Sequence, residues 1–316
     1  MAAETFQQKT AVPPTAMAAL RAAFGGRVKE HTSLARFTAA RVGGLADGLL
    51  EVNSLDELAQ ACTLLWKAGS PILILGGGSN VLVSDAGVRG VVLINRTRQV
   101  RFESESKPQV WAESGANFGM LARQAASRGL AGLEWAAGIP GTVGGAVIGN
   151  AGAHSGDMAG NLLLAEILHP NGVRENWMVD RFEYAYRSSV LKEYPGSAVV
   201  LAALLRLESS TPESVQAKMD VYNDQRRRTQ PPGASIGSMF KNPPGDFAGR
   251  LLDAAGMKGM VVGDAEISPL HANFFINRGR ATASDIWTLI ERAREVVAQQ
   301  FGVQLELEIE RVGDWR

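Results

Sequence analysis

The sequence predicts a protein that mixes helices and strands in more than one domain. Short apolar runs typical of strands alternate with capped, amphipathic segments typical of helices. A helix start at Thr211-Pro212, with Thr as the cap and Pro at the first helical position, separates a second mixed segment from the first. The length of 316 residues is enough for two or three domains.

Composition and charge exclude several classes of protein. Lys and Arg together number 32, as do Asp and Glu, so the chain lacks the basic surplus of a nucleic-acid binder. A single cysteine, Cys62, allows no intramolecular disulfide, and the histidines show no metal-ligand spacing, so we expect no metal site. The first residues lack the regions of a signal peptide, and the longest apolar run, 198–205, is too short to span a membrane. We therefore expect a soluble, cytoplasmic protein.

The first part of the chain alternates strands and helices. Residues 1 to about 18 are predicted to be a disordered lead-in. Ser54 and Glu57 form a capping box that begins an amphipathic helix. A buried strand at 71–75 then leads into glycines 76–78. Further elements are predicted downstream: strands at 90–95, 100–103, 110–113, 164–169 and 199–207, and a helix over 118–128 that Asn117 caps and Gly129 ends.

The segment after Thr211 predicts three helices and a final strand. The first helix runs to Arg228, the second from a cap at Asp246 to Ala255, and the third from a cap at Ser284 to Phe301. The final strand, 303–312, alternates cleanly, with Val303, Leu305, Leu307 and Ile309 on one face and Gln304, Glu306, Glu308 and Glu310 on the other.

Two glycine-rich stretches are candidates for ligand binding. Residues 76–80, Gly-Gly-Gly-Ser-Asn between two predicted strands, favour a turn whose backbone N–H groups hold a phosphate. The turn is not a Rossmann fingerprint, because Val81 stands at the position of the third glycine. The stretch 138–156 is apolar, unlike a flexible linker, and favours ordered backbone packed against something flat. Together they suggest a dinucleotide, with its diphosphate on 76–80 and a flat ring under 138–152; the alternative is two unrelated sets of turns.

Side chains that can transfer a proton or bind charge occur at four places. Ser238 stands beside a cation in a stiffened loop and is a candidate proton donor, the alternative being a capped turn. Arg187, among aromatic residues, could bind a carboxylate or phosphate, or form a surface ion pair. The glutamates at 306–310 share a strand face that could simply be solvated. Arginines 226–228 could meet phosphates, or complement a helix dipole and aid solubility.

Taken together, these segments resemble those of the UDP-N-acetylenolpyruvoylglucosamine reductases, the MurB flavoenzymes of peptidoglycan synthesis. The sequence departs from the family pattern at Leu45, where Pro is expected, and at Leu191, where Phe is expected. The short spacing from Arg187 to Ser238 resembles the family branch that lacks an extra tyrosine-bearing loop. The matching motifs follow the family's order and lie at 34–44, 76–80, 138–141, 186–192, 237–243, 271–274 and 305–313.

The resemblance implies an α+β fold. A two-lobed FAD-binding domain of the vanillyl-alcohol-oxidase (PCMH) type would span 20–208, with lobes at about 20–95 and 96–208. A smaller α+β substrate-binding domain would span 213–302. The C-terminal strand within 303–316 would return to the active site.

The resemblance also implies an oxidoreductase of cell wall biogenesis with non-covalent FAD. NADPH would give a hydride to FAD, and reduced FAD would give a hydride to C3 of UDP-N-acetylglucosamine enolpyruvate. A proton added at C2 would then yield UDP-N-acetylmuramate. Two rival readings are an FAD-dependent oxidase of the same fold, for which His154 is the candidate covalent link, and a nucleotide-binding protein without catalysis.

Roles for individual residues follow from the same resemblance. Ser238, in its Gly-Ser-x-Phe-Lys-Asn-Pro motif, would be the proton donor. Arg187, in Tyr-Arg-x-Ser, and Glu308 on the last strand would stabilise the charge that develops on the substrate. The substrate would contact Tyr186, Lys241 and Asn242. The cofactor would contact Gly76, Gly77, Gly78, Ser79, Asn80, Ile139, Gly141, Gly145, Ile148, Gly152 and Ala153.

Overall fold

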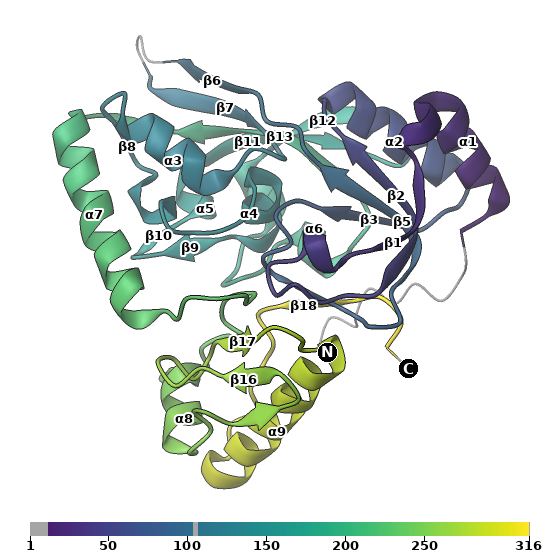
Figure 1. Ribbon diagram of the computed structural model, residues 1–316. Coiled ribbons are helices and arrows are strands. Elements are labelled where there is room, and N and C mark those ends of the chain that lie inside the picture. Colours follow the sequence, from purple (N-terminus) through teal and green to yellow (C-terminus); the bar gives the residue numbers. More distant parts are fainter. Residues whose placement is uncertain (1–11, 104–106, 316) are drawn as a thin grey trace.

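The computed structural model describes residues 12–103 and 107–315, in which two sheets lie above a smaller C-terminal part in the view of Figure 1. The first sheet has the order β1-β2-β5-β3; β2 and β3 each pair with β5 in parallel, and β1 pairs with β2 antiparallel. Two helices, α1 and α2, form a buried core with β2 and β5. The bounds are α1 (Pro14–Phe24), β1 (Lys29–Ser33), β2 (Leu45–Val52), α2 (Leu55–Lys67), β3 (Ile72–Leu75) and β5 (Val88–Asn95).

Predictions for this first sheet are confirmed where a local signal decides the structure. Ser54 caps α2, because its Oγ accepts a hydrogen bond from the Glu57 N–H at 3.2 Å. The other half of the predicted capping box differs, because Glu57 Oε2 accepts from the Asn53 N–H at 2.8 Å instead of from the Ser54 N–H. The predicted disordered lead-in is wrong from Pro14 onward, since α1 begins there and buries Leu20 completely; residues 1–11 lie outside the described ranges. The predicted burial of β3 is correct only for Leu75, because β3 is an edge strand.

The second sheet is antiparallel throughout, with the order β12-β11-β13-β7-β6. Asn117 caps α3 as predicted, because its Oδ1 accepts a hydrogen bond from the Met120 N–H at 2.8 Å. Phe118 of α3 and Val147 of α4 are completely buried in the core of this lobe. The bounds are β6 (Val100–Glu103), β7 (Gln109–Glu113), α3 (Phe118–Ala126), α4 (Val143–Gly149), α5 (Met158–Asn161), β11 (Leu162–Leu168), β12 (Arg174–Met178), α6 (Val190–Glu193) and β13 (Val199–Arg206).

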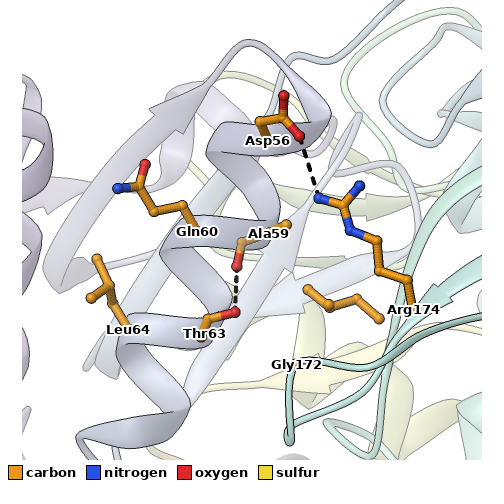
Figure 2. Close-up of a pocket in the computed structure, with 8 residues that line it drawn as sticks. Asp56, Ala59, Gln60, Thr63, Leu64, Gly172 and Arg174 are labelled. Atoms are coloured by element: carbon orange, nitrogen blue, oxygen red, sulfur yellow. Dashed lines mark hydrogen bonds and ion pairs between the residues drawn. The ribbon is translucent and has the colours of Figure 1, made fainter.

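Helix α2 joins the two sheets. Leu65 on α2 shares one buried cluster with Leu168 of β11 and Leu201 of β13. At the surface, Arg174 Nη2 donates to Asp56 Oδ1 at 3.3 Å across an open depression of about 340 Å³ (Figure 2). The Asp56 side chain is 92% exposed, so this ion pair contributes little to stability. The shared apolar core therefore holds the two lobes together.

Helix α7 (Pro212–Thr229) lies along the second lobe and reaches down to the C-terminal part (Figure 1). Its Val215 and Met219 form a buried cluster with Ala126 and Ala137. The predicted domain ranges of 20–208 and 213–302 stay a prediction. The packing of α7 favours a boundary after this helix rather than before it.

The C-terminal part forms a buried core that Ala40, Val42 and Leu82 of the first part join. Two of its helix caps differ from those predicted. Thr282 caps α9 and forms a capping box with Asp285, whereas Ser284 lies in the first turn and donates its hydroxyl to Asp85 Oδ2 at 2.7 Å. Phe247, not Asp246, holds the cap position of α8, because the Asp246 carboxylate pairs with Arg250. The bounds are α8 (Ala248–Ala254), β15 (Val261–Val262), β16 (Ala265–Ile267), β17 (Phe275–Asn277) and α9 (Ala283–Phe301).

The predicted final strand, 303–312, is much shorter in the structure. Only β18 (Glu310–Val312) is a strand, and it pairs in parallel with β4 (Val81–Val83). The preceding residues leave that ladder, because the Glu308 N–H donates to the Met239 carbonyl at 2.9 Å. The predicted alternation of burial still holds for Leu305 and Ile309, which are 1% and 3% exposed.

The remaining elements are short. They are η1 (Gly25–Arg27), η2 (Ala35–Phe37), β8 (Leu130–Ala131), η3 (Glu134–Ala136), β9 (Gly152–Ala153), β10 (Gly156–Asp157), η4 (Val179–Phe182) and β14 (Glu208–Ser209). None of the helices in the described ranges combines the length and apolar character needed to cross a bilayer.

Candidate active site

The two glycine-rich stretches pack directly on each other. The loop 76–80 connects β3 to β4, and its Ser79 Oγ donates to the Pro140 carbonyl at 3.1 Å. A Cβ added to Gly76 would lie 2.3 Å from Thr142 Oγ1, and one added to Gly78 would lie 2.1 Å from the Phe37 carbonyl oxygen. Gly78 also has a φ of +61°, which favours glycine. The loop therefore needs glycine for its fit against neighbouring backbone.

The second stretch contains a helix where the sequence favours turns and irregular backbone. Helix α4 forms from the glycine-rich run itself, because Gly144 packs so closely on Ser114 that an added Cβ would lie 2.8 Å from the Ser114 Cβ. The helix ends at Asn150, whose φ is +42°. Gly145 is exposed, and an added Cβ there would meet only Thr142 Oγ1 at 3.8 Å. Ile139 and Ile148, in the same glycine-rich stretch, are half-buried.

Arg187 and Glu308, 121 residues apart in the chain, form a half-buried ion pair. Arg187 Nε donates to Glu308 Oε1 at 2.7 Å, and the two side chains are 23% and 19% exposed. Arg187 Nη2 also donates to the Gly152 carbonyl at 2.7 Å, within the second glycine-rich stretch. The backbone of Arg187 has a φ of +56°, a conformation that is strained for a side chain other than glycine. The guanidinium is thus held at a defined place beside β9.

Each of the three glutamates on the predicted strand face meets a different cation. Glu306 lies 3.5 Å from Lys241 Nζ, and Glu310 lies 3.0 Å from Lys192 Nζ. Their side chains are 76% and 43% exposed, so Glu308 is the most buried of the three. The structure therefore distinguishes Glu308 from its neighbours by burial and by its short contact with Arg187.

The segment that carries Ser238 lies between two other segments. On one side, the Met239 N–H donates to the Asn273 carbonyl and the Phe240 N–H to Asn273 Oδ1, both at 2.9 Å. On the other, the Met239 carbonyl accepts from the Glu308 N–H. The Ser238 hydroxyl has no hydrogen-bond partner among the residues of 12–103 and 107–315. The main chain thus brings Ser238 beside the strand of Glu308 and leaves its hydroxyl free to meet a ligand.

The other predicted substrate-binding residues lie on the same segments. Tyr186 is 53% exposed, with its ring centroid 5.3 Å from the Arg187 guanidinium carbon. Asn242 Oδ1 accepts a hydrogen bond from the Ala248 N–H at 3.1 Å, so this oxygen supports α8. Lys241 is paired with Glu306, as described above.

Two asparagines connect the parts of the site, Asn80, which was predicted as a cofactor contact, and Asn150, which had no predicted role. Asn80 Nδ2 donates to the Glu308 carbonyl at 3.2 Å, which connects the first glycine loop to the candidate catalytic residue Glu308. The sequence predicted Asn80 as a cofactor contact but did not predict this hydrogen bond. Asn150 Nδ2 donates to the Ala185 carbonyl at 3.0 Å and so ties the end of α4 to the segment of Arg187. The residue type of Asn150 could have indicated its position, because Asn commonly adopts the left-handed conformation at the end of a helix.

In the part of the chain that the structure describes, the ionisable groups around the site do not form a metal centre. Over the described residues, no group of three or more His, Cys, Asp and Glu side chains is arranged to hold a metal ion. His154 stacks on Tyr222, with ring centroids 4.0 Å apart and planes 6° from parallel. Burial, and secondarily the nearby Arg226, lower the pKa of His154, so its imidazole is neutral at pH 7.

Comparisons with known proteins match both parts of the chain. A model of the FAD binding domain matches residues 46–175, and a model of the UDP-N-acetylenolpyruvoylglucosamine reductase C-terminal domain matches residues 228–312. A UDP-N-acetylenolpyruvoylglucosamine reductase of Chloroflexus aggregans is 45% identical over 287 residues, which are 89% of this chain and 96% of that protein. One of Rubrobacter xylanophilus is 46% identical and covers 89% of this chain and 94% of that protein.

A solved structure agrees with these relatives. The crystal structure of the reductase MurB from Thermus caldophilus superposes with a TM-score of 0.78 at 36% identity, over 90% of this chain and 99% of that one. The predicted α+β fold class, with an FAD-binding domain and a smaller C-terminal domain, is confirmed. The chain belongs to the UDP-N-acetylenolpyruvoylglucosamine reductase family of flavoenzymes.

Proposed function

We propose that this enzyme uses NADPH to reduce UDP-N-acetylglucosamine enolpyruvate to UDP-N-acetylmuramate, in the cytoplasm, as a step of peptidoglycan precursor synthesis. One observation carries the proposal. The Arg187–Glu308 pair contacts the second glycine-rich stretch through the Gly152 carbonyl and the first glycine loop through Asn80. A charged pair that could meet the substrate is therefore joined directly to both segments expected to hold the cofactor.

The glycine segments fit a non-covalent FAD. Gly76 and Gly78 allow the loop 76–80 to lie flat against its neighbours, and the exposed Gly77 leaves backbone open to a diphosphate. Exposed Gly145, with the half-buried Ile139 and Ile148, offers an apolar surface for a flat ring. The chemistry that FAD supplies when bound is the transfer of a hydride from NADPH to the substrate.

The protein's own side chains would stabilise the negative charge that develops on the substrate and would supply a proton. Hydride addition at C3 of the enolpyruvyl group leaves negative charge at C2 and on the attached carboxylate. The Arg187 guanidinium supplies a fixed positive charge for that carboxylate, and Glu308 holds the guanidinium in orientation through Nε. Because the guanidinium is held before substrate arrives, little reorganisation is needed during the reaction.

Ser238 would complete the reaction by protonating C2. The Oγ–H bond breaks, a C2–H bond forms, and the serine oxygen recovers a proton from water. The absence of a hydrogen-bond partner for this hydroxyl among the described residues supports this role, because the proton is not engaged elsewhere. Tyr186, Lys241 and the amide nitrogen of Asn242 are proposed to hold the substrate.

An anaerobic experiment tests this function against its rivals. The purified protein is reduced with NADPH without oxygen, UDP-N-acetylglucosamine enolpyruvate is added, and flavin absorbance is followed. Rapid reoxidation with formation of UDP-N-acetylmuramate is expected. If the reduced protein is reoxidised by air but not by the substrate, the oxidase is favoured. A colourless protein that takes up no added FAD would favour the binding protein. Acid precipitation should release all of the FAD.

A further inference from the structure

The three consecutive arginines near the end of α7 differ in their surroundings. Arg227 pairs with Asp224, one turn earlier on the helix, and its side chain is 77% exposed. Arg228 is exposed as well. Arg226 is half-buried and points toward the FAD-binding lobe rather than toward solvent. Only Arg226 therefore has surroundings that differ from an ordinary helix end.

Arg226 lies directly over Gly138, the first residue of the second glycine-rich stretch. A Cβ added to Gly138 would lie 2.4 Å from Arg226 Cδ and 2.6 Å from Arg226 Nε. Any other residue at position 138 would displace the arginine. The glycine at this position thus leaves room for a cation on the stretch expected to cover the cofactor.

The guanidinium of Arg226 has no carboxylate and no hydrogen-bond acceptor among the residues that the structure describes. Every other cation named at the site is paired: Arg187 with Glu308, Lys192 with Glu310 and Lys241 with Glu306. Taking a charge partly out of water without a partner is unfavourable. Burial accordingly lowers the pKa of Arg226.

The neighbours of Arg226 do not neutralise it either. His154, in the turn between β9 and β10, stacks on Tyr222, one helical turn before Arg226. The turn itself is unusual, since His154 and Ser155 have φ values of +50° and +65°. A neutral imidazole and a phenol ring thus border the cation, which leaves its charge available to a ligand.

We propose that Arg226 binds a phosphate group of a nucleotide that lies over Gly138. The inference rests on the proposed function, since FAD, NADPH and the UDP-linked substrate each carry a diphosphate. A planar guanidinium donates two parallel hydrogen bonds to phosphate oxygens, which suits a site built from backbone and aromatic rings. The chemistry is the same for all three sources, and the experiment separates them.

The test compares Arg226→Gln with Arg226→Lys, and with Arg227→Gln as the matched control on the same helix. Affinity for FAD is measured by titrating protein from which flavin has been removed. KM values for NADPH and for UDP-N-acetylglucosamine enolpyruvate are measured on FAD-saturated enzyme. Arg226→Gln should weaken at least one of the three by about 10- to 100-fold, and the ligand affected identifies the source. Arg226→Lys should lose less, and Arg227→Gln should resemble wild type.

Thermal stability without flavin separates ligand binding from a structural role. Because Arg226→Gln removes an unpaired, partly buried charge, its Tm should equal or exceed that of wild type. Three unchanged affinities, whatever the Tm, would overturn the proposal. An equal loss of affinity in Arg227→Gln would overturn it as well. If wild-type enzyme is not reoxidised by the UDP-linked substrate, the proposed function fails, while the FAD titration still reports on Arg226.

Discussion

The proposed cofactor side of the site is formed mainly by backbone, and the proposed catalytic side is formed by side chains. On the proposed cofactor side, residues 76–80 and 138–149 are rich in glycine and packed so closely that Gly76 and Gly78 have no room for a Cβ. On the catalytic side, Arg187, Ser238 and Glu308 present side chains on segments that main-chain hydrogen bonds hold together. Close backbone packing therefore determines the proposed cofactor side, and the chemistry of three side chains determines the proposed catalytic side. Substitutions on the first should therefore remove the cofactor, and substitutions on the second should slow one step while the cofactor remains.

The largest effect is expected from Gly77→Asp on the cofactor side. A Cβ there would lie 3.0 Å from the Gly141 Cα, and the carboxylate would repel a diphosphate. The variant should be purified without FAD, as measured by the ratio of flavin to protein absorbance. Gly26→Ala is the control, since no atom lies within 4 Å of its added Cβ. Wild-type occupancy in Gly77→Asp would contradict the assignment of this loop.

Ser238→Ala tests the catalytic side and should separate the two half-reactions. FAD content and reduction by NADPH should stay close to wild type, because neither needs a proton from Ser238. Reoxidation by the UDP-linked substrate should slow by about 10²–10⁴-fold, the usual cost of losing a positioned acid. Ser238→Cys keeps a protic group and should recover part of the rate. Stopped-flow absorbance measures each half; if both slow alike, Ser238 shapes the pocket instead of donating a proton.

Glu308→Gln should have a smaller effect on the same half-reaction. The amide no longer attracts the guanidinium as an ion, so Arg187 loses a charge-assisted hydrogen bond, and a loss of about 10- to 100-fold is expected. Glu306→Gln and Glu310→Gln are controls on the same strand face, and as more exposed pairs they should change the rate by less than about threefold. Similar small effects at all three positions would indicate that these glutamates form only a solvated strand face, without a catalytic role.

The smallest effect is expected far from both sides, at Glu175 on β12. A hydrogen bond from Arg181, joined by one from Trp177, lowers the pKa of Glu175 to about 2. Because the folded-state pKa lies below the unfolded value, the stabilisation is present above about pH 4.5 and is lost as the pH falls toward 2. Glu175→Gln should flatten the pH dependence of Tm slightly in that window without changing either half-reaction. An unaltered pH profile of Tm would show that this exposed network contributes nothing measurable.

Features set by neighbouring residues were predictable from the sequence. Ser54 and Asn117 cap helices because each side chain reaches a backbone N–H three residues on, which the local residue order reveals. The same rule failed at Ser284, because Thr282 two residues earlier is also a good cap and its partner Asp285 completes the box. Asp85, from a distant loop, instead accepts hydrogen bonds from the Ser284 hydroxyl and backbone. Local signals thus predicted that a helix begins there, but not which residue caps it.

Features set by distant residues were not predictable in this way. Residue spacing placed Glu306, Glu308 and Glu310 on one face, and the family resemblance selected Glu308. What separates them physically is Arg187, whose position depends on the fold of the second lobe. Helix α4 was missed because glycine is a poor helix former. Its close approach to Ser114, which only glycine permits, is a tertiary contact that outweighs this local preference.

The pairing of β18 with β4 has a consequence for the order in which the protein can be assembled. Asn80 and Glu308 are joined by a hydrogen bond across 228 residues of sequence. During synthesis the first sheet has all of its strands long before residue 308 leaves the ribosome, yet β4 must wait for its partner. Contacts of such long range form late and slow folding. A competent active site therefore requires the last residues of the chain: before residue 308 is synthesised, all strands of both sheets are available but the Asn80–Glu308 contact cannot form.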